Sequence, residues 1–179
     1  MYETQHPSPA LLLAMLQRDI LPALTFTEPW CSLMAAGRKR VETRSWRTTY
    51  HGPVALHAAS TLPRDLDALC HQEHFYEALA LSHFRGGRWS FPVKHVLAIG
   101  MLEEIVPTEA ITISERERAF GNYRAGRYAW RFSAIYRLNT PLRARGSLSL
   151  WQWTPPESFW QEIQEAYDAV LAKQGKAGA

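Results

Sequence analysis

Polar and apolar positions alternate in several short segments of this chain, and alternation with a period of two is typical of strands. In residues 40–46 (RVETRSW) the alternation places Arg40, Glu42, Arg44 and Trp46 on one face. A different segment, VLAIGML, is apolar on both faces, as a fully buried strand requires. The pattern predicts five strands, at residues 23–27, 40–46, 54–60, 93–106 and 128–138.

Helical spacing and helix-end signals mark four other segments. A serine followed by a proline predicts the start of an N-terminal helix over residues 9–19. A short helix opens after Pro29 and ends at Gly37, and residues 62–84 are the longest helical candidate. The capping box TPPE opens a C-terminal helix over residues 155–173. The intervening RGGRWSFP is predicted to be a mobile loop.

Composition indicates one globular domain. Hydrophobic residues make up 46% of the chain and charged residues 21%, and no linker divides the sequence, so residues 1–179 are predicted to form a single α+β domain. No apolar run is long enough to span a bilayer, so no membrane partner is expected. Two cysteines, Cys31 and Cys70, are too few for a disulfide framework, which predicts a cytoplasmic location.

Several common catalytic sites are absent from the sequence. It contains neither a GxxxxGK[ST] phosphate loop nor a GxGxxG turn, and it lacks the HxE and PCxxC pair of zinc deaminases. Cys70, His71 and His74 lie close together, but a metal needs three or four ligands and no partner pair is visible. We therefore expect no metal and no cofactor.

The cationic side chains are unevenly distributed, although the net charge is only +3. Residues 38–47 hold five cationic side chains and one acid, and residues 116–145 hold eight arginines and one acid. Such asymmetry indicates an anionic partner, with a solvated basic surface as the alternative interpretation. The candidate contacts to a nucleic-acid backbone are Arg38, Arg40, Arg47, Arg124 and Arg127.

Residues 24–60 contain PWCSL near their start, GRKRVETRSW in the middle and HA near their end. This arrangement resembles the ASCH domain family (activating-signal-cointegrator homology), whose pattern is PW(A/C)SL, then GxKxxExRSW, then a glycine-led strand ending in HA or AA. Residues 120–130 (FGNYRAGRYAW) and GSLSLWQW further on are similar to the closing strands of that family. The resemblance spans about residues 23–153.

The resemblance implies a PUA-like fold, a small and mostly antiparallel β-barrel with flanking helices. It also implies nucleic-acid binding, and a branch of small bacterial members hydrolyses acetylated cytidine with a lysine, a threonine and a distant glutamate. Lys39 matches the lysine, whereas Glu42 stands at the threonine position. For the distant glutamate the sequence leaves Glu109, Glu115 and Glu117 open.

The spacing of the motif supports a charged cluster independently. Gly37 ends a helix, so Lys39 is predicted to lie where the chain turns into the strand, at the barrel mouth beside Glu42 and Arg44. If this face of the strand points inward, the charges neutralise one another and leave donors for a ligand. A desolvated lysine can also act as a base or nucleophile. The alternative is an exposed ladder of ion pairs.

Aromatic side chains in or beside the motifs supply possible stacking surfaces for bases. Core packing is the competing role for each of them, and Trp30 and Trp160 are predicted to be structural. The candidate aromatic ligand contacts are Trp46, Tyr128, Trp130 and Trp151.

Three functions follow from these features. The first is a nucleic-acid or nucleotide-binding module, with RNA or single-stranded DNA as the favoured partner. The second is a small hydrolase, acting on a modified nucleoside or as a nuclease, with Lys39 and Glu42 as catalytic residues. The third is a protein-interaction domain in which the charged cluster is structural.

Overall fold

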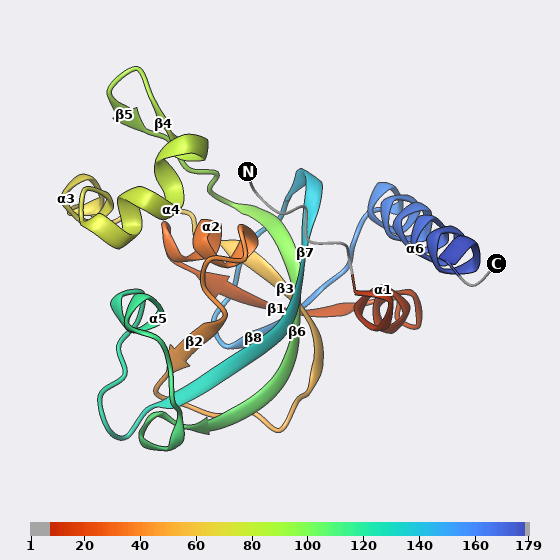
Figure 1. The fold of residues 1–179 in the computed structure, drawn as a ribbon, viewed down its shortest axis with the longest axis horizontal. Helices are drawn as coiled ribbons and strands as arrows, with labels where there is room; N and C mark the ends of the chain where they lie inside the picture. The colour runs from red at the N-terminus through yellow and green to blue at the C-terminus, as the bar shows by residue number, and fades with distance from the viewer. Residues whose placement is uncertain (1–7, 178–179) are drawn as a thin grey trace.

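A six-stranded mixed sheet forms the centre of the molecule, which we describe from a computed structural model over residues 8–177 (Figure 1). The strand order is β2-β7-β6-β3-β1-β8, and only β1 and β3 run parallel among the paired neighbours. The strands are β1 (Leu21–Phe26), β2 (Val41–Arg44), β3 (Gly52–Ala58), β6 (His95–Pro107), β7 (Tyr128–Arg143) and β8 (Leu150–Trp153).

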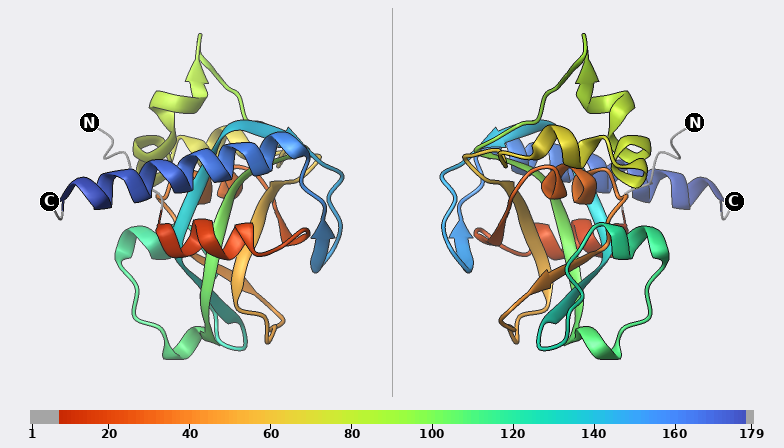
Figure 2. Two further views of the ribbon diagram at one scale, coloured as in Figure 1. Left: turned by 90° about the vertical axis from the view of Figure 1, so that its right-hand side faces the viewer. Right: turned by 90° about the vertical axis from the view of Figure 1, so that its left-hand side faces the viewer.

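Helices cover the sheet on two opposite sides (Figure 2). The helices α1 (Pro9–Leu16) and α6 (Glu157–Ala177) lie on one side, while α2 (Trp30–Ala35), α3 (Leu66–Cys70), α4 (Glu73–His83) and α5 (Glu115–Ala119) lie on the other. A 3-10 turn at Thr108–Ala110 follows β6. Among the described residues, no helix combines the length and the apolar character needed to cross a bilayer.

Two hydrophobic cores lie on opposite faces of the sheet because successive strand residues point to opposite faces. In β1, Ala23 packs with the α1 and α6 side, and Leu24 packs with the α2 side. In β6, Ile99 packs on the α1 and α6 side and Ala98 packs on the α2 side. The prediction that VLAIGML forms a buried strand is confirmed.

The predicted β-barrel is not found as a closed barrel among the described strands, which form a six-stranded mixed sheet. The edge strands β2 and β8 each pair with one neighbour and not with each other. At the β2 edge, the carboxylate of Glu117 accepts hydrogen bonds from the backbone N–H groups of Arg40 (3.0 Å) and Val41 (3.2 Å). A side chain therefore occupies these two backbone donors where β2 begins.

Two segments between the strands differ from their predictions. The single helix expected over residues 62–84 is two helices, because Gln72 adopts an extended backbone conformation between α3 and α4. The predicted loop RGGRWSFP contains a two-stranded hairpin of β4 (Phe84–Arg85) and β5 (Arg88–Trp89), which projects from the body of the molecule (Figure 1). Gly86 and Gly87 have φ values of +56° and +77°, as the tight turn of a short hairpin requires.

The terminal helices also have different bounds. The N-terminal helix ends at Leu16 rather than at residue 19, and the C-terminal helix runs from Glu157 to Ala177 rather than over residues 155–173. The left-handed Gly37 after α2 has φ +66°, as the helix-end prediction required.

A buried carboxyl group at the start of α2 makes the stability of the fold depend on pH. Glu28 has no exposed surface and accepts hydrogen bonds from Ser32 N (3.0 Å) and Ser32 Oγ (3.0 Å). Burial raises the pKa of Glu28 from its ordinary value near 4.5 to about 7, although both bonds oppose the shift. The folded state therefore binds the proton more tightly than the unfolded state does.

We expect the free energy of unfolding to fall as the pH rises from about 4.5 to 7, since the folded protein binds more protons in this window. The loss of stability due to Glu28 across this window is about 3 kcal/mol. Glu28→Gln should remove it, which chemical denaturation of both proteins at several pH values would measure. A constant stability difference between the two proteins from pH 4 to 8 would contradict the expectation.

Candidate nucleic-acid-binding site

Lys39 lies inside the protein rather than at an open mouth. Its side chain has no exposed surface, and its Nζ donates a hydrogen bond to the Val41 carbonyl. The same nitrogen is 3.8 Å from the Glu42 carboxylate and 3.6 Å from that of Glu117. Burial lowers the pKa of Lys39, and the two carboxylates counteract the shift. The prediction of a mouth-facing ammonium is therefore wrong.

The local backbone explains this burial. After the left-handed Gly37, the N–H groups of Arg38 and Lys39 both donate to the carbonyl of Leu33, at 2.9 and 3.2 Å. These bonds turn the chain back against α2 before β2 begins. The turn directs the lysine towards the interior instead of towards solvent.

Glu117 is the glutamate that the fold brings to Lys39. It lies in α5, whose N-cap Ser114 accepts a hydrogen bond from Glu117 N. Besides its backbone contacts with β2, Glu117 accepts a hydrogen bond from the Tyr123 hydroxyl at 3.3 Å. Of the other two candidates, Glu109 accepts a hydrogen bond from Gly126 N at 2.8 Å, and Glu115 is exposed. The cluster of Lys39, Glu42 and Glu117 thus fixes α5 against β2.

A hollow of about 330 Å³ opens beside this cluster, and we call it the motif cleft. A second hollow of about 370 Å³ adjoins it and shares Trp30, Glu42 and Arg127 with it. The sequence motif therefore lines a surface depression. The principal residues of the motif cleft are Thr25, Trp30, Glu42, Arg44, Trp46 and Arg127.

The charged groups of the motif cleft are held in fixed positions. Arg44 Nε lies 3.1 Å from Glu42 Oε1, and the Arg44 Nη2 group donates to the Thr25 carbonyl at 2.8 Å. Arg127 donates to the Thr43 carbonyl at 2.8 Å. The predicted charged cluster is thus present, with Glu42 14% exposed and Arg44 24% exposed. The side chains of Glu42 and Arg44 reach the surface of the cleft, whereas Lys39 is buried behind them, 3.8 Å from Glu42.

The predicted aromatic contacts divide between the cleft and the core. Trp46 is half-buried and lies edge-on to Trp130, with ring centroids 4.7 Å apart. Trp130 has no exposed surface and its indole N–H donates to the Trp46 carbonyl at 3.3 Å, so it is a core residue. Tyr128 packs, half-buried, against the same core. Trp151 donates a hydrogen bond to Thr25 Oγ1 at 3.1 Å.

The predicted backbone-contact arginines are not gathered at one place. Arg127 lines the motif cleft, whereas Arg47 and Arg124 are exposed outside its lining. Arg38 and Arg40 are half-buried, and Arg40 donates to the Ser133 carbonyl at 3.3 Å. The structure therefore connects only Arg127 of this group directly with the cleft.

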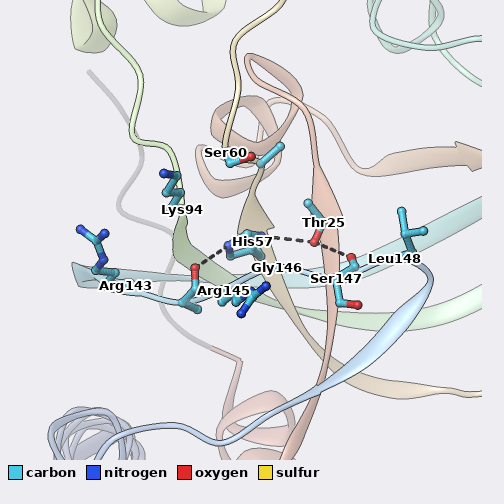
Figure 3. A pocket seen from close by; sticks show the side chains of 11 residues that line it. Thr25, His57, Ser60, Lys94, Arg143, Arg145, Gly146, Ser147 and Leu148 are labelled. Atoms are coloured by element: carbon cyan, nitrogen blue, oxygen red, sulfur yellow. Dashed lines mark hydrogen bonds between the residues drawn. The ribbon is translucent and has the colours of Figure 1, made fainter.

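A larger hollow of about 760 Å³, which we call the basic pocket, was not anticipated from the sequence. Thr25 lines both the motif cleft and the basic pocket, so the two adjoin at the end of β1. The cationic residues of the basic pocket come from separate segments of the chain. The sequence pointed only to Arg143 and Arg145, because they lie in the arginine-rich region 116–145. The principal lining residues are Thr25, His57, Lys94, Arg143, Arg145 and Gly146 (Figure 3).

Comparisons with known proteins assign this α+β domain to a family. The ASCH domain model matches residues 24–140. The crystal structure of ASCH from Zymomonas mobilis has a TM-score of 0.41 at 13% identity, covering 80% of this chain and 93% of that one. Two mutants of the same Zymomonas protein give TM-scores of 0.43 and 0.42 at 12% and 13% identity, covering 80% and 83% of this chain and 94% and 98% of theirs. No curated protein matches the sequence.

The chain belongs to the ASCH domain family, because the family model covers most of its length. The family is PUA-like and is associated with RNA binding.

Proposed function

We propose that this protein binds single-stranded RNA, with one base held in the motif cleft. The observation that carries the proposal is the position of Glu42. Its carboxylate reaches the cleft while Lys39 and Arg44 neutralise and orient it. An oriented carboxylate accepts hydrogen bonds from the amino groups of a base, as Glu and Asp do with cytosine.

The surrounding side chains suit the rest of a nucleotide. Trp46 and Trp30 border the cleft and offer aromatic surface to a base. Arg44 and Arg127 retain guanidinium N–H groups beyond those used for the Thr25 and Thr43 carbonyls. Guanidinium groups bind phosphates and base carbonyls. Stacking supplies affinity, and these polar groups supply orientation.

The alternative of a hydrolase that uses Lys39 and Glu42 has less geometric support. Lys39 is fully buried, and the Glu42 oxygens are engaged separately, Oε1 by Arg44 and Oε2 by Lys39. A nucleophile or general base has to reach the atom it attacks or deprotonates. The arrangement favours a pocket that holds a ligand over a pair that transfers a proton.

Titration of a labelled oligoribonucleotide at several salt concentrations tests the proposal. We expect the logarithm of the affinity to fall linearly with the logarithm of salt concentration, by about 0.7 for each phosphate contacted on a single strand. Unlabelled nucleosides and DNA of the same sequence serve as competitors, and chromatography of the mixture reveals any product. Absence of RNA binding at low salt would contradict the proposal, and product formation would support the hydrolase instead.

A further inference from the structure

The basic pocket concentrates positive charge without any compensating acid. Its cationic side chains are Lys94, Arg143 and Arg145, and none of its lining residues carries a carboxylate (Figure 3). All three cationic residues are exposed, and none of them forms an ion pair with another described residue. Three cationic side chains that line one hollow make its electrostatic potential positive, so the pocket favours an anionic ligand.

The backbone holds these cations side by side. Lys94 N donates to the Ala58 carbonyl at 2.9 Å, and Ala144 N donates to the Lys94 carbonyl at 3.0 Å. Lys94 has φ +61°, a left-handed conformation that is uncommon for a side chain of this kind. Residues held in such conformations are concentrated at ligand-binding sites. The segment that carries Arg143 and Arg145 is thus fastened to the start of β6.

A neutral hydrogen-bonded network forms the base of the pocket. His57 is 1% exposed, with Nε2 3.1 Å from the Ala144 carbonyl and Nδ1 3.2 Å from Thr25 Oγ1. Burial lowers the pKa of His57, so the ring is neutral at pH 7 and Nε2–H donates to Ala144. Thr25 Oγ1 in turn lies 3.1 Å from the Ser147 carbonyl. The Nε2–H bond anchors Ala144, and the single Thr25 hydroxyl proton is donated either to His57 Nδ1 or to the Ser147 carbonyl.

Gly146 allows this segment to pass directly over the histidine. A Cβ atom at Gly146 would lie 2.4 Å from His57 Cε1 and 2.9 Å from Thr25 Oγ1, which is too close for any side chain. The close approach brings the 143–148 segment against the ends of β1 and β3. Lys94 and Arg145 lie outside the strands, but the segments that carry them are held in place around the hollow.

We propose that the basic pocket is a phosphate-binding site for a nucleotide whose base or neighbouring base occupies the motif cleft. The volume of about 760 Å³ is larger than inorganic phosphate needs and suits a nucleotide-sized ligand. Thr25, which lines both hollows, places the pocket beside the cleft. The inference of phosphate binding depends on the charge of the basic pocket itself, whereas the link to RNA rests on the proposed function.

The test compares ligands with and without phosphate on Arg143→Gln/Arg145→Gln. The probes are adenosine, adenosine 5′-monophosphate and an eight-nucleotide oligoadenylate, each titrated by calorimetry at low salt. Wild-type protein should bind the monophosphate at least tenfold more tightly than adenosine, and the double variant should lose this gain while its adenosine affinity is unchanged. Arg85→Gln/Arg88→Gln removes the same charge from the projecting β4–β5 hairpin and should keep the gain.

The outcomes separate the two proposals. Loss of the gain in the double variant supports the phosphate site even if the oligonucleotide fails to bind, in which case RNA binding alone is refuted. If the double variant binds both the monophosphate and the oligonucleotide more weakly, the ligand of the pocket is a phosphate of the RNA strand. If only monophosphate binding is weaker, the ligand is a free nucleotide. The phosphate site is overturned if the monophosphate binds no more tightly than adenosine, or if the double variant retains the gain. Lys94→Gln should also weaken the binding of adenosine 5′-monophosphate, which checks the result with a second variant.

Discussion

Lys39→Ala is expected to lower the free energy of unfolding by about 3 to 5 kcal/mol. Lys39 is fully buried and lies within 4 Å of two carboxylates, at 3.8 Å from Glu42 and 3.6 Å from Glu117. Removing the cation takes the ammonium away from Glu117, which is only 12% exposed, and leaves Glu42 paired with Arg44, and the loss at Glu117 accounts for most of the destabilisation. Chemical denaturation of the variant and the wild type at neutral pH measures the difference.

Two further variants identify the cause of that loss. Lys39→Met fills most of the same space but carries no charge, so it should be nearly as destabilising as alanine. Lys173→Ala removes an exposed lysine from α6 and should change stability by less than about 0.5 kcal/mol. A Lys39→Ala protein of nearly wild-type stability that no longer binds RNA would contradict a structural role and restore a direct functional one.

Trp130→Ala is expected to cost a similar amount, about 3 to 5 kcal/mol, because it removes a large side chain from the core. Trp130 has no exposed surface and packs edge-on to Trp46. The more conservative Trp130→Phe should lose less stability and should keep its RNA affinity, since the indole does not reach the cleft. Thermal melting and RNA titration of the two variants check both statements. A stable Trp130→Phe protein with greatly weakened RNA binding would show instead that Trp130 contacts the ligand.

The elements that depend on local signals were predictable from the sequence. The apolar run in β6 can satisfy both faces only as a buried strand, and Gly37 ends α2 with the left-handed backbone that glycine tolerates best. The period-two alternation placed Glu42 and Arg44 on one face of β2, where they form an ion pair. These features needed no information from distant parts of the chain.

Features that depend on distant contacts were not predictable. The start of β2 and the buried Lys39 both contact Glu117, which lies 77 residues beyond Arg40 in the chain. No spacing rule selects it over Glu109 or Glu115. The burial of Trp130 depends on the turn that places Trp46 above it.

The basic pocket illustrates the same limit for the site. Its walls come from the ends of β1 and β3, from Lys94 before β6, and from the segment between β7 and β8. Only the fold brings these four segments together. Composition showed that residues 116–145 are rich in arginine, but it could not show that Arg143 and Arg145 line a hollow with Lys94 while Arg131 pairs with Glu104.

The RNA affinity of Trp46→Ala shows whether the motif cleft holds a base of single-stranded RNA. Trp46 borders the cleft and is half-buried, so its removal takes away stacking surface. Stacking on an aromatic side chain contributes about 1 to 3 kcal/mol per base, which corresponds to a loss of roughly 5-fold to 150-fold in affinity. The control Tyr76→Ala removes an aromatic residue that is 42% exposed on α4, away from the cleft. We expect Trp46→Ala to weaken RNA binding by this factor and Tyr76→Ala to leave it unchanged, and equal affinities for all three proteins would contradict base binding in the cleft.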